Sequence, residues 1–408
     1  MRAASPAPLH LTAGSLALLA LTLPGQISCK GCASDQTIIP QGDDTAATVA
    51  PPAPYENDWG QWLSMDVMSD GRPALAYYDR TKGALGFAIA NVDGDTVTWD
   101  REKPDGWTDD NGMDVGDRGK YTGMAVAHDG TVWVSYQDVT LQALRAARRD
   151  PNTGEWTNMA ADGGGEPSGT GGMFSSVALD AASSPVIVHY DDMMRQLRMA
   201  RWNGTAFSTS VIDAGEAVTD ADGAEVPADV GGYADIAIAD GVEYMAYYDA
   251  AAGNLKLAWG TPGNYTIEVV DDGGGNKHLD GGGDVGQWPD VLITDGQVWI
   301  SYQDVGNQDL LLAHGVPGSW TTEVVDNGEY VGADTALFLN GTEMSMAYFD
   351  GRNNDMKMAT KIGDAWQVST LASDGALGFH NAVVLSNGSY FVACYDYTRR
   401  TVWFDHLR

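Results

Sequence analysis

The chain has 408 residues, 44% of them hydrophobic, and a formal net charge of −33 at pH 7. Lys and Arg total 23 against 56 Asp and Glu, a balance that repels phosphate backbones and anionic lipid and so excludes nucleic-acid partners. Of the 56 acids only 11 are Glu and 45 are Asp, and there are 50 Gly, so residues of tight turns far outnumber residues of exposed helix faces. The composition therefore disfavours helical and doubly wound α/β folds, while the apolar fraction suffices for a sizeable core.

Residues 1–28 have the layout of a lipoprotein-type signal peptide. A basic residue at position 2 precedes an apolar run over residues 9–23 that is too short and too interrupted for a membrane span. The following Gln-Ile-Ser-Cys resembles the lipobox of bacterial lipoproteins, although that family favours Leu where Gln26 stands, and the resemblance makes Cys29 the expected acylation site. The alternative is an ordinary signal peptide, after which Cys29 and Cys32 form a local disulfide or stay free.

The same resemblance predicts where the protein resides. A non-acidic residue after the acylated cysteine, here Lys30, goes with outer-membrane sorting in Gram-negative cells. We therefore expect an exported protein that faces the periplasm or the cell surface and touches the membrane only through an N-terminal lipid anchor. Residues 29–55 are rich in Ala, Pro, Asp and Thr without hydrophobic periodicity, which predicts a flexible tether.

A small–aromatic–aromatic–Asp signature recurs along the remaining chain, as in Ala76-Tyr77-Tyr78-Asp79. Six residues after the Asp stands an apolar residue, and nine residues after it stands Ala in six of the copies. A Gly-x-aromatic segment and an alternating apolar stretch precede most copies. The seven repeated carboxylates are Asp79, Asp138, Asp191, Asp249, Asp304, Asp350 and Asp396.

Each repeat is typical of four short strands joined by Gly, Asp and Asn turns, which is the pattern of a propeller blade. The sequence thus predicts an all-β fold over residues 56–408, a seven-bladed β-propeller of four-stranded antiparallel blades. The expected blades span approximately residues 58–112, 113–168, 169–226, 227–281, 282–328, 329–373 and 374–408. The last copy contains only three strands, so we expect an N-terminal strand within residues 36–56 to complete it and to pair the exposed edges.

The repeated carboxylates are expected at the turn after the second strand, on the face where the Gly-x-aromatic segments enter the channel. An Asp that opens a turn of constant length accepts hydrogen bonds from amides two or three residues on, so its main expected role is structural. A shared cation or ligand site is the alternative. Asp66, Asp235, Asp290 and Asp334 fall in or near the inner strands and add negative potential to the channel.

Acidic, glycine-rich loops between the blades are the candidate metal sites. Hard cations such as Ca²⁺ favour several oxygen ligands on turns that Gly permits. The two loops with the most acids, residues 213–229 and 271–284, lack the EF-hand spacing. The alternative is a solvated acidic loop. The candidate Ca²⁺ ligands are Asp220, Asp222, Asp271, Asp272, Asp280 and Asp284.

The sequence assigns no catalytic residue. The seven His residues show no paired metal-ligand spacing, and no Gly-x-Ser-x-Gly elbow or phosphate loop occurs. Whether the protein is an enzyme stays open, with a non-catalytic role favoured.

The repeats resemble those of secreted bacterial β-propellers that are similar in shape to sialidases and to fucose-binding propeller lectins. The Asn254-Leu255-Lys256-Leu257-Ala258 segment carries this resemblance together with the Asp signature. The Ser-x-Asp-x-Gly-x-x-Trp box of sialidases is missing, and Arg145, Arg148 and Arg149 fall in one strand instead of converging from separate blades.

The favoured function is a non-catalytic, monomeric cell-surface or periplasmic module that recognises glycans or envelope or extracellular proteins through its loop face. A glycoside hydrolase or lyase of the sialidase-like propeller type is the first alternative. A structural or assembly component of the envelope is the second.

Overall fold

The part of the chain that the structure describes is entirely β-structure. The computed structural model describes residues 57–94, 96–106, 116–163, 171–220, 222–275 and 283–407. These ranges contain the strands β1 to β29 and no helix, so none of the described residues forms a helix able to span a membrane. The predicted signal peptide with Cys29, the tether and the N-terminal strand within residues 36–56 lie outside the described residues.

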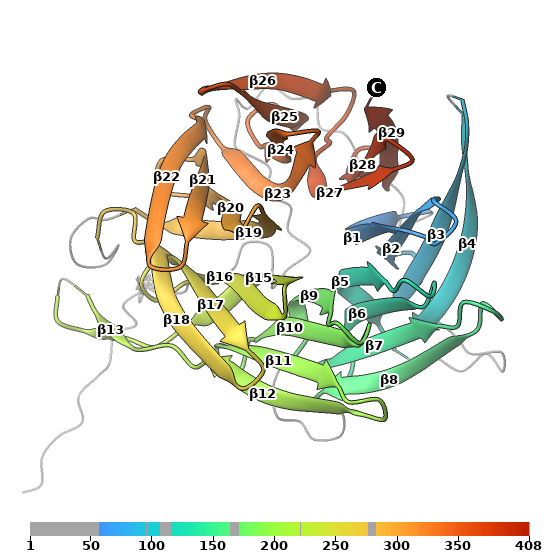
Figure 1. The fold of residues 1–408 in the computed structure, drawn as a ribbon, viewed down its shortest axis with the longest axis horizontal. Coiled ribbons are helices and arrows are strands. Elements are labelled where there is room, and N and C mark those ends of the chain that lie inside the picture. The colour runs from blue at the N-terminus through green and yellow to red at the C-terminus, as the bar shows by residue number, and fades with distance from the viewer. Residues whose placement is uncertain are drawn as a thin grey trace, which may run out of the picture. The chain divides into compact units, whose positions relative to one another are not determined.

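Within the described residues, the strands form seven antiparallel blades in chain order and one further two-stranded sheet (Figure 1). Blade 1 contains β1 (Trp59–Val67), β2 (Pro73–Asp79), β3 (Ala84–Asp93) and β4 (Thr96–Gly106). Blade 2 contains β5 (Arg118–Val126), β6 (Val132–Asp138), β7 (Ala143–Arg149) and β8 (Trp156–Asp162). Blade 3 contains β9 (Met173–Leu179), β10 (Pro185–Asp191), β11 (Gln196–Trp202) and β12 (Phe207–Asp213).

The second half of the ring repeats this order. Blade 4 contains β15 (Val230–Ala239), β16 (Val242–Asp249), β17 (Asn254–Thr261) and β18 (Asn264–Asp271). Blade 5 contains β19 (Val285–Thr294), β20 (Gln297–Asp304), β21 (Asp309–Val316) and β22 (Ser319–Asp326). Blade 6 contains β23 (Val331–Asn340), β24 (Glu343–Asp350), β25 (Asp355–Ile362) and β26 (Ala365–Ala372). Blade 7 contains β27 (Phe379–Ser386), β28 (Ser389–Asp396) and β29 (Thr401–Leu407), and a short hairpin of β13 (Val218–Thr219) and β14 (Glu225–Val226) precedes blade 4.

The sheets are arranged as the blades of a ring. The first strand of each blade lies nearest the axis and contacts the first strands of both neighbouring blades, including β27 against β1 (Figure 1). The predicted all-β, seven-bladed propeller is therefore confirmed. Six blades have four strands and the seventh has three within the described residues.

One backbone hydrogen bond recurs at all seven junctions between blades. An amide at the entry of each inner strand donates to the carbonyl four residues after the repeated Asp of the preceding blade, at 2.9–3.2 Å. At the seam between the chain ends, the Trp59 amide donates to the Arg400 carbonyl at 3.1 Å in the same way. The ring is thus closed at blade 7 by the contact that joins the other blades.

The hydrophobic core lies between adjacent blades. Each of its clusters combines the second and third strands of one blade with the strands of the next, and the seam has its own cluster around Trp59, Leu75, Phe391 and Phe404. Because every blade buries both of its faces against neighbours, the second strands of the blades, such as β2, β6 and β10, are almost continuously buried. Polar side chains that remain between blades must therefore be paired.

Candidate functional site

The seven repeated Asp residues lie at the ends of the second strands. In six of them Oδ1 accepts the amide hydrogen of the residue three positions on, for example from Leu141 to Asp138 at 2.9 Å. The seventh, Asp79, pairs with the ammonium group of Lys82 at 3.2 Å. The structure therefore places these carboxylates in seven separate turns, each engaged with the backbone or a side chain of its own turn.

A second set of Asp residues joins neighbouring blades, and sequence reasoning missed it. In five of the six four-stranded blades, an Asp at the end of the fourth strand accepts a hydrogen bond from the buried Tyr or His in the second strand of the next blade. Tyr247 donates to Asp213 at 2.7 Å and Tyr348 donates to Asp326 at 2.6 Å. The five pairs are Tyr136–Asp105, His189–Asp162, Tyr247–Asp213, Tyr302–Asp271 and Tyr348–Asp326.

A cation from the third strand completes four of these pairs. Lys256 lies 2.5 Å from Asp213, and Arg198 lies 2.7 Å from Asp162. Burial alone would raise the pKa of Asp162, but hydrogen bonds from His189 and Arg198 lower it to about 2. The Asp162 carboxylate is therefore ionised. Local donors match each carboxylate of the set, which makes these side chains part of the blade-to-blade packing.

The candidate calcium ligands do not converge among the described residues. Oδ1 of Asp220 accepts the amides of Asp222 and Ala224 at 3.0 and 2.8 Å, which closes the turn between β13 and β14. Asp271 accepts from Tyr302 of the next blade. Oδ1 of Asp272 accepts the Gly274 amide, and Asp284 accepts the Tyr248 hydroxyl. Asp280 lies outside the described residues, and within them no three acidic, His or Cys side chains are grouped so as to hold a metal ion.

Seven side chains, one near the start of each inner strand, form a connected set. Each of its members sits in a bulge with positive φ, directly after the repeated Gly-x pair. Neighbouring aromatic rings lean on one another at centroid distances between 4.2 and 5.7 Å, and Asp334 faces His380 at 3.5 Å. We call this set the channel collar: Trp62, Tyr121, Phe174, Tyr233, Trp288, Asp334 and His380. The tilted packing of the rings ties the seven inner strands together.

Below the collar, two carboxyl groups of the inner strands face each other. Asp235 accepts the Ser176 hydroxyl at 2.6 Å and the Val291 amide at 2.9 Å. Asp290 accepts the Leu337 amide at 2.7 Å. Burial, and then the charge and hydrogen bond of Asp235, raise the pKa of Asp290 well above its usual range. These acids therefore satisfy edge amides of the inner strands that have no strand partner.

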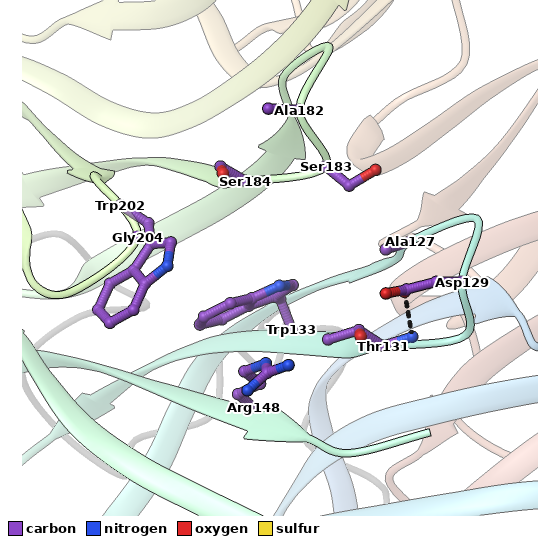
Figure 2. Close-up of a pocket in the computed structure, with 10 residues that line it drawn as sticks. All are labelled: Ala127, Asp129, Thr131, Trp133, Arg148, Ala182, Ser183, Ser184, Trp202 and Gly204. Atoms are coloured by element: carbon purple, nitrogen blue, oxygen red, sulfur yellow. Dashed lines mark hydrogen bonds between the residues drawn. The ribbon is translucent and has the colours of Figure 1, made fainter. Parts of the chain in front are cut away.

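The clearest cavity lies between blades 2 and 3, on the opposite face of the ring from the repeated Asp turns. Figure 2 shows its lining, which comes from the turns between β5 and β6, β9 and β10, and β11 and β12, together with β6, β7 and β11. Its volume is about 270 Å³. We call it the blade 2–3 pocket: Ala127, Asp129, Thr131, Trp133, Arg148, Ala182, Ser183, Ser184, Trp202 and Gly204.

Two indole rings dominate the blade 2–3 pocket. The ring centroids of Trp133 and Trp202 lie 5.6 Å apart, and the Phe207 ring packs against both, at 6.3 Å from Trp133 and 5.1 Å from Trp202. Trp133 is 4% exposed and is held in the core of the blade interface, whereas Trp202 is half-buried and faces the cavity. Figure 2 shows Arg148 beside Trp133, with the two serines on the other side of the indoles in this view.

The polar part of the pocket is balanced in charge. Oδ1 of Asp129 accepts the Thr131 amide at 2.9 Å, and this hydrogen bond lowers the pKa of the carboxyl. Arg148 of β7 is the cross-strand partner of Trp133 of β6, and its guanidinium lies 5.8 Å from the Trp133 ring centroid. Sequence reasoning did not single out Trp133 or Trp202. The available signal was that an indole five residues before the repeated Asp occurs only in the second and fifth copies.

Comparison with known proteins is consistent with the fold and goes no further. No protein-family model and no curated protein matches the chain. Among solved structures, the chain is similar to a prolyl endopeptidase, with a TM-score of 0.49 and 11% identity over 86% of this chain and 50% of that one. The intramolecular trans-sialidase of Ruminococcus gnavus has a TM-score of 0.43 and 10% identity, covering 87% and 95% of the two chains. The fucose-recognising lectin of Aleuria aurantia, a six-bladed propeller, has a TM-score of 0.43 and 13% identity, covering 76% and 95%. The chain spans about half the length of the endopeptidase.

Proposed function

We propose that the protein is a carbohydrate-binding propeller and that the blade 2–3 pocket holds a sugar ring. The observation that carries the proposal is the pair of indoles, Trp133 and Trp202, in a cavity that combines aromatic faces with convergent polar groups. Aromatic rings provide flat apolar surface for the C–H face of a sugar, and a few placed polar groups then fix its orientation. Asp129, Ser183 and Ser184 supply such groups.

The size of the cavity supports a small occupant. At about 270 Å³ it lies just below the 300–1,000 Å³ that is typical of sites for drug-sized ligands. One pyranose ring, projecting from a longer glycan, suits this volume better than a peptide or an extended chain. The opening lies among turns at the edge of two blades, where the rest of a glycan would extend into solvent.

Another blade junction with an indole at the equivalent position lacks this combination. At the junction of blades 5 and 6 the equivalent of Trp133 is Trp299, which stacks on His314 at 4.7 Å. The place of Trp202 is taken there by Lys361, which pairs with Glu323 at 2.5 Å. The junction of blades 5 and 6 thus has an internal ion pair where the blade 2–3 pocket has an exposed indole face. This difference supports a specialised role for the blade 2–3 pocket.

The test is binding to a glycan array, followed by calorimetry on any glycan retained. Trp202→Ala should weaken binding about tenfold or more, because it removes the exposed aromatic face. Trp366→Ala removes an indole from the outer strand of blade 6 and is the matched control, with thermal unfolding measured for both. If the wild-type protein retains no glycan at micromolar concentration, or if Trp202→Ala binds as well as wild type, the proposal fails. Hydrolysis of a retained glycan would move the assignment to a glycoside hydrolase.

A further inference from the structure

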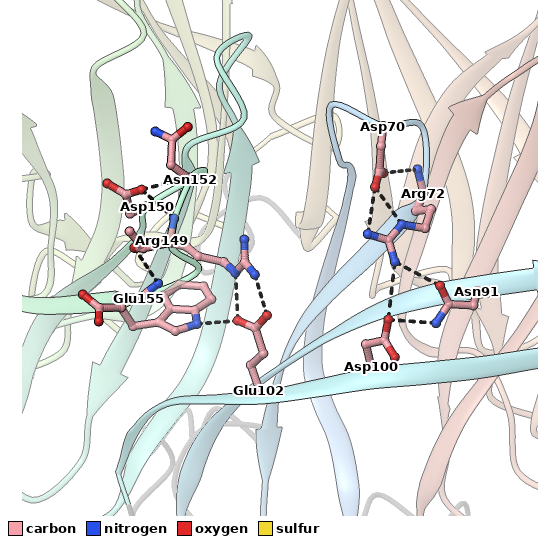
Figure 3. Close-up of polar contacts among 11 residues, drawn as sticks. Asp70, Arg72, Asn91, Asp100, Glu102, Arg149, Asp150, Asn152 and Glu155 are labelled. Atoms are coloured by element: carbon pink, nitrogen blue, oxygen red, sulfur yellow. Dashed lines mark hydrogen bonds and ion pairs between the residues drawn. The ribbon is translucent and has the colours of Figure 1, made fainter.

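The arginines of β7 differ in how they are neutralised. Arg145 pairs with Asp105 at 3.2 Å. Arg149 donates through Nε and Nη2 to Glu102 at 2.8 and 2.7 Å, an arrangement visible in Figure 3. Arg148 forms no ion pair with any carboxylate in the described ranges of the chain, although it lies on the same strand of a strongly acidic protein. The exception lines the blade 2–3 pocket.

The next junction shows what a neutralised arginine looks like at the same place. Arg201 of blade 3 lies ten residues after its repeated Asp, as Arg148 does in blade 2. Arg201 Nη2 lies 2.5 Å from the carboxylate of Glu243, a residue of blade 4 that is 2% exposed. The Tyr265 hydroxyl also donates to Glu243, at 2.6 Å. The junction of blades 3 and 4 therefore contains an internal arginine–carboxylate–tyrosine cluster.

The junction of blades 2 and 3 lacks both partners of this cluster. Pro185 stands six residues before the repeated Asp of blade 3, where Glu243 stands in blade 4. Phe207 stands sixteen residues after it, where Tyr265 stands in blade 4. The arginine is retained while its carboxylate and the supporting hydroxyl are replaced by apolar side chains. The Arg148 side chain is exposed, and neither of these positions supplies an acceptor for its guanidinium.

We propose that the blade 2–3 pocket takes an acidic sugar and that the sugar carboxylate binds Arg148, in the role that Glu243 has toward Arg201. This inference rests on the proposed carbohydrate-binding function and specifies its ligand class. A guanidinium presents its N–H groups as a planar fork that matches a carboxylate in two parallel hydrogen bonds. A sugar ring stacked on the indoles would bring a ring carboxylate alongside Trp133, where the guanidinium stands.

Two features oppose an anionic ligand, and neither outweighs the unpaired arginine. The net charge of −33 acts over long range, but at physiological salt it is screened beyond about 8 Å. Asp129 is ionised within the pocket, yet its Oδ1 is occupied by the Thr131 amide. The charged groups of the lining are thus one carboxylate and one guanidinium, and a ligand carboxylate would share the charge of Arg148 with Asp129.

The experiment compares glycans ending in glucuronate, galacturonate or sialate with neutral counterparts that lack the carboxylate. Wild type should prefer an acidic member of the panel, and added salt should weaken that binding. Arg148→Gln should lose about tenfold or more in affinity for it and little for the neutral counterpart. Arg195→Gln is the control, because it removes an exposed arginine from the opposite face and changes the net charge equally.

A variant that introduces an internal carboxylate also tests whether Arg148 binds the carboxylate of the ligand. Pro185→Glu, combined with Phe207→Tyr, reproduces the partners of Arg201 and should occupy Arg148 internally. We expect this variant to lose acidic-glycan binding while it unfolds at a temperature no lower than wild type. If it unfolds early, Arg148→Gln alone decides the question, since that side chain is exposed.

The outcomes separate the two proposals. Equal binding of acidic and neutral glycans, unchanged by Arg148→Gln but weakened by Trp202→Ala, would overturn the acidic ligand class and keep the sugar site. If no glycan binds, or if Trp202→Ala has no effect, both proposals are overturned.

Discussion

The carboxylate of Asp58, just before the first strand of blade 1, accepts a hydrogen bond of 2.7 Å from the hydroxyl of Tyr395 at the end of β28 in blade 7. The same contact joins neighbouring blades inside the ring, where Tyr78 donates to Asp117 at 2.8 Å. The two ends of the described chain are therefore joined by a standard blade-to-blade contact, and this contact is buried at the seam.

Tyr395→Phe should weaken the closure of the ring. Removing the hydroxyl leaves the buried Asp58 carboxylate without this donor, which should lower the free energy of unfolding by about 1–3 kcal/mol. Chemical denaturation followed by tryptophan fluorescence measures the change. The parallel variant is Tyr78→Phe, whose partner Asp117 is partly exposed and whose loss should cost less. Equal losses of unfolding free energy in both variants would show that the seam contact contributes no more to stability than the contact at another junction.

Lys256→Met should destabilise the junction of blades 3 and 4. The ammonium group lies 2.5 Å from Asp213, and the two side chains are only 12% and 10% exposed, so breaking the pair should cost about 3 kcal/mol. Burial raises the pKa of Asp213, but hydrogen bonds from Lys256 and Tyr247 lower it below the ordinary 3.8. The stabilisation is therefore present above pH 3.8 and is lost as the pH falls through the folded-state pKa. Unfolding titrations near pH 7 and pH 3 should show a smaller difference from wild type at the acidic value.

Asp290→Asn should stabilise the protein near neutral pH. Because the folded state holds the Asp290 proton to a higher pH than the unfolded chain does, wild-type stability falls as the pH rises from the ordinary 3.8 toward the raised folded-state pKa. The amide is neutral at every pH and preserves an acceptor for the Leu337 amide. We expect the stability of Asp290→Asn to exceed that of wild type by more at pH 7 than at pH 4, with the exposed Asp364→Asn as control. A destabilised variant at pH 7 would contradict the raised pKa.

Cys29→Ala should abolish lipid attachment if the resemblance to the lipobox holds. Expression in a Gram-negative host with a radiolabelled or alkyne-tagged fatty acid should label the wild-type chain and leave the variant unlabelled. Cys32→Ala is the control, since it removes the neighbouring thiol and leaves the acylation site intact. Labelling of Cys29→Ala, or no labelling of wild type, would contradict the predicted anchor.

The repeat could be recognised from the amino-acid sequence because the interactions that define it lie within a few residues of one another. The turn after each second strand is closed by a carboxylate that accepts an amide three residues on, as in Asp138 and Leu141, so the Asp recurs at a constant place in the sequence. Alternation of apolar residues before it marked the strands, and the seven copies fixed the number of blades. None of this required knowledge of which blades touch.

The side-chain contacts between neighbouring blades could not be predicted from the sequence in the same way. The Asp at the end of β12 was not distinguished from the many other acids, and only its distance to Tyr247 and Lys256 reveals its role. Likewise, the acids proposed as calcium ligands were grouped by proximity in the sequence. In the structure Asp271 accepts from Tyr302 of the next blade, whereas Asp272 accepts from the amide of its own turn.

The amino-acid sequence by itself determined the all-β class, the seven repeats and the turn that closes each second strand, because these depend on backbone preferences and contacts within a few residues. Only the tertiary structure decided where a ligand site could lie. Trp133 and Trp202 belong to different blades, and Pro185 is informative only beside Arg148, which it leaves without the carboxylate that Glu243 provides to Arg201. Such a site arises from the juxtaposition of blades, which is set by packing around the whole ring and not by any one repeat.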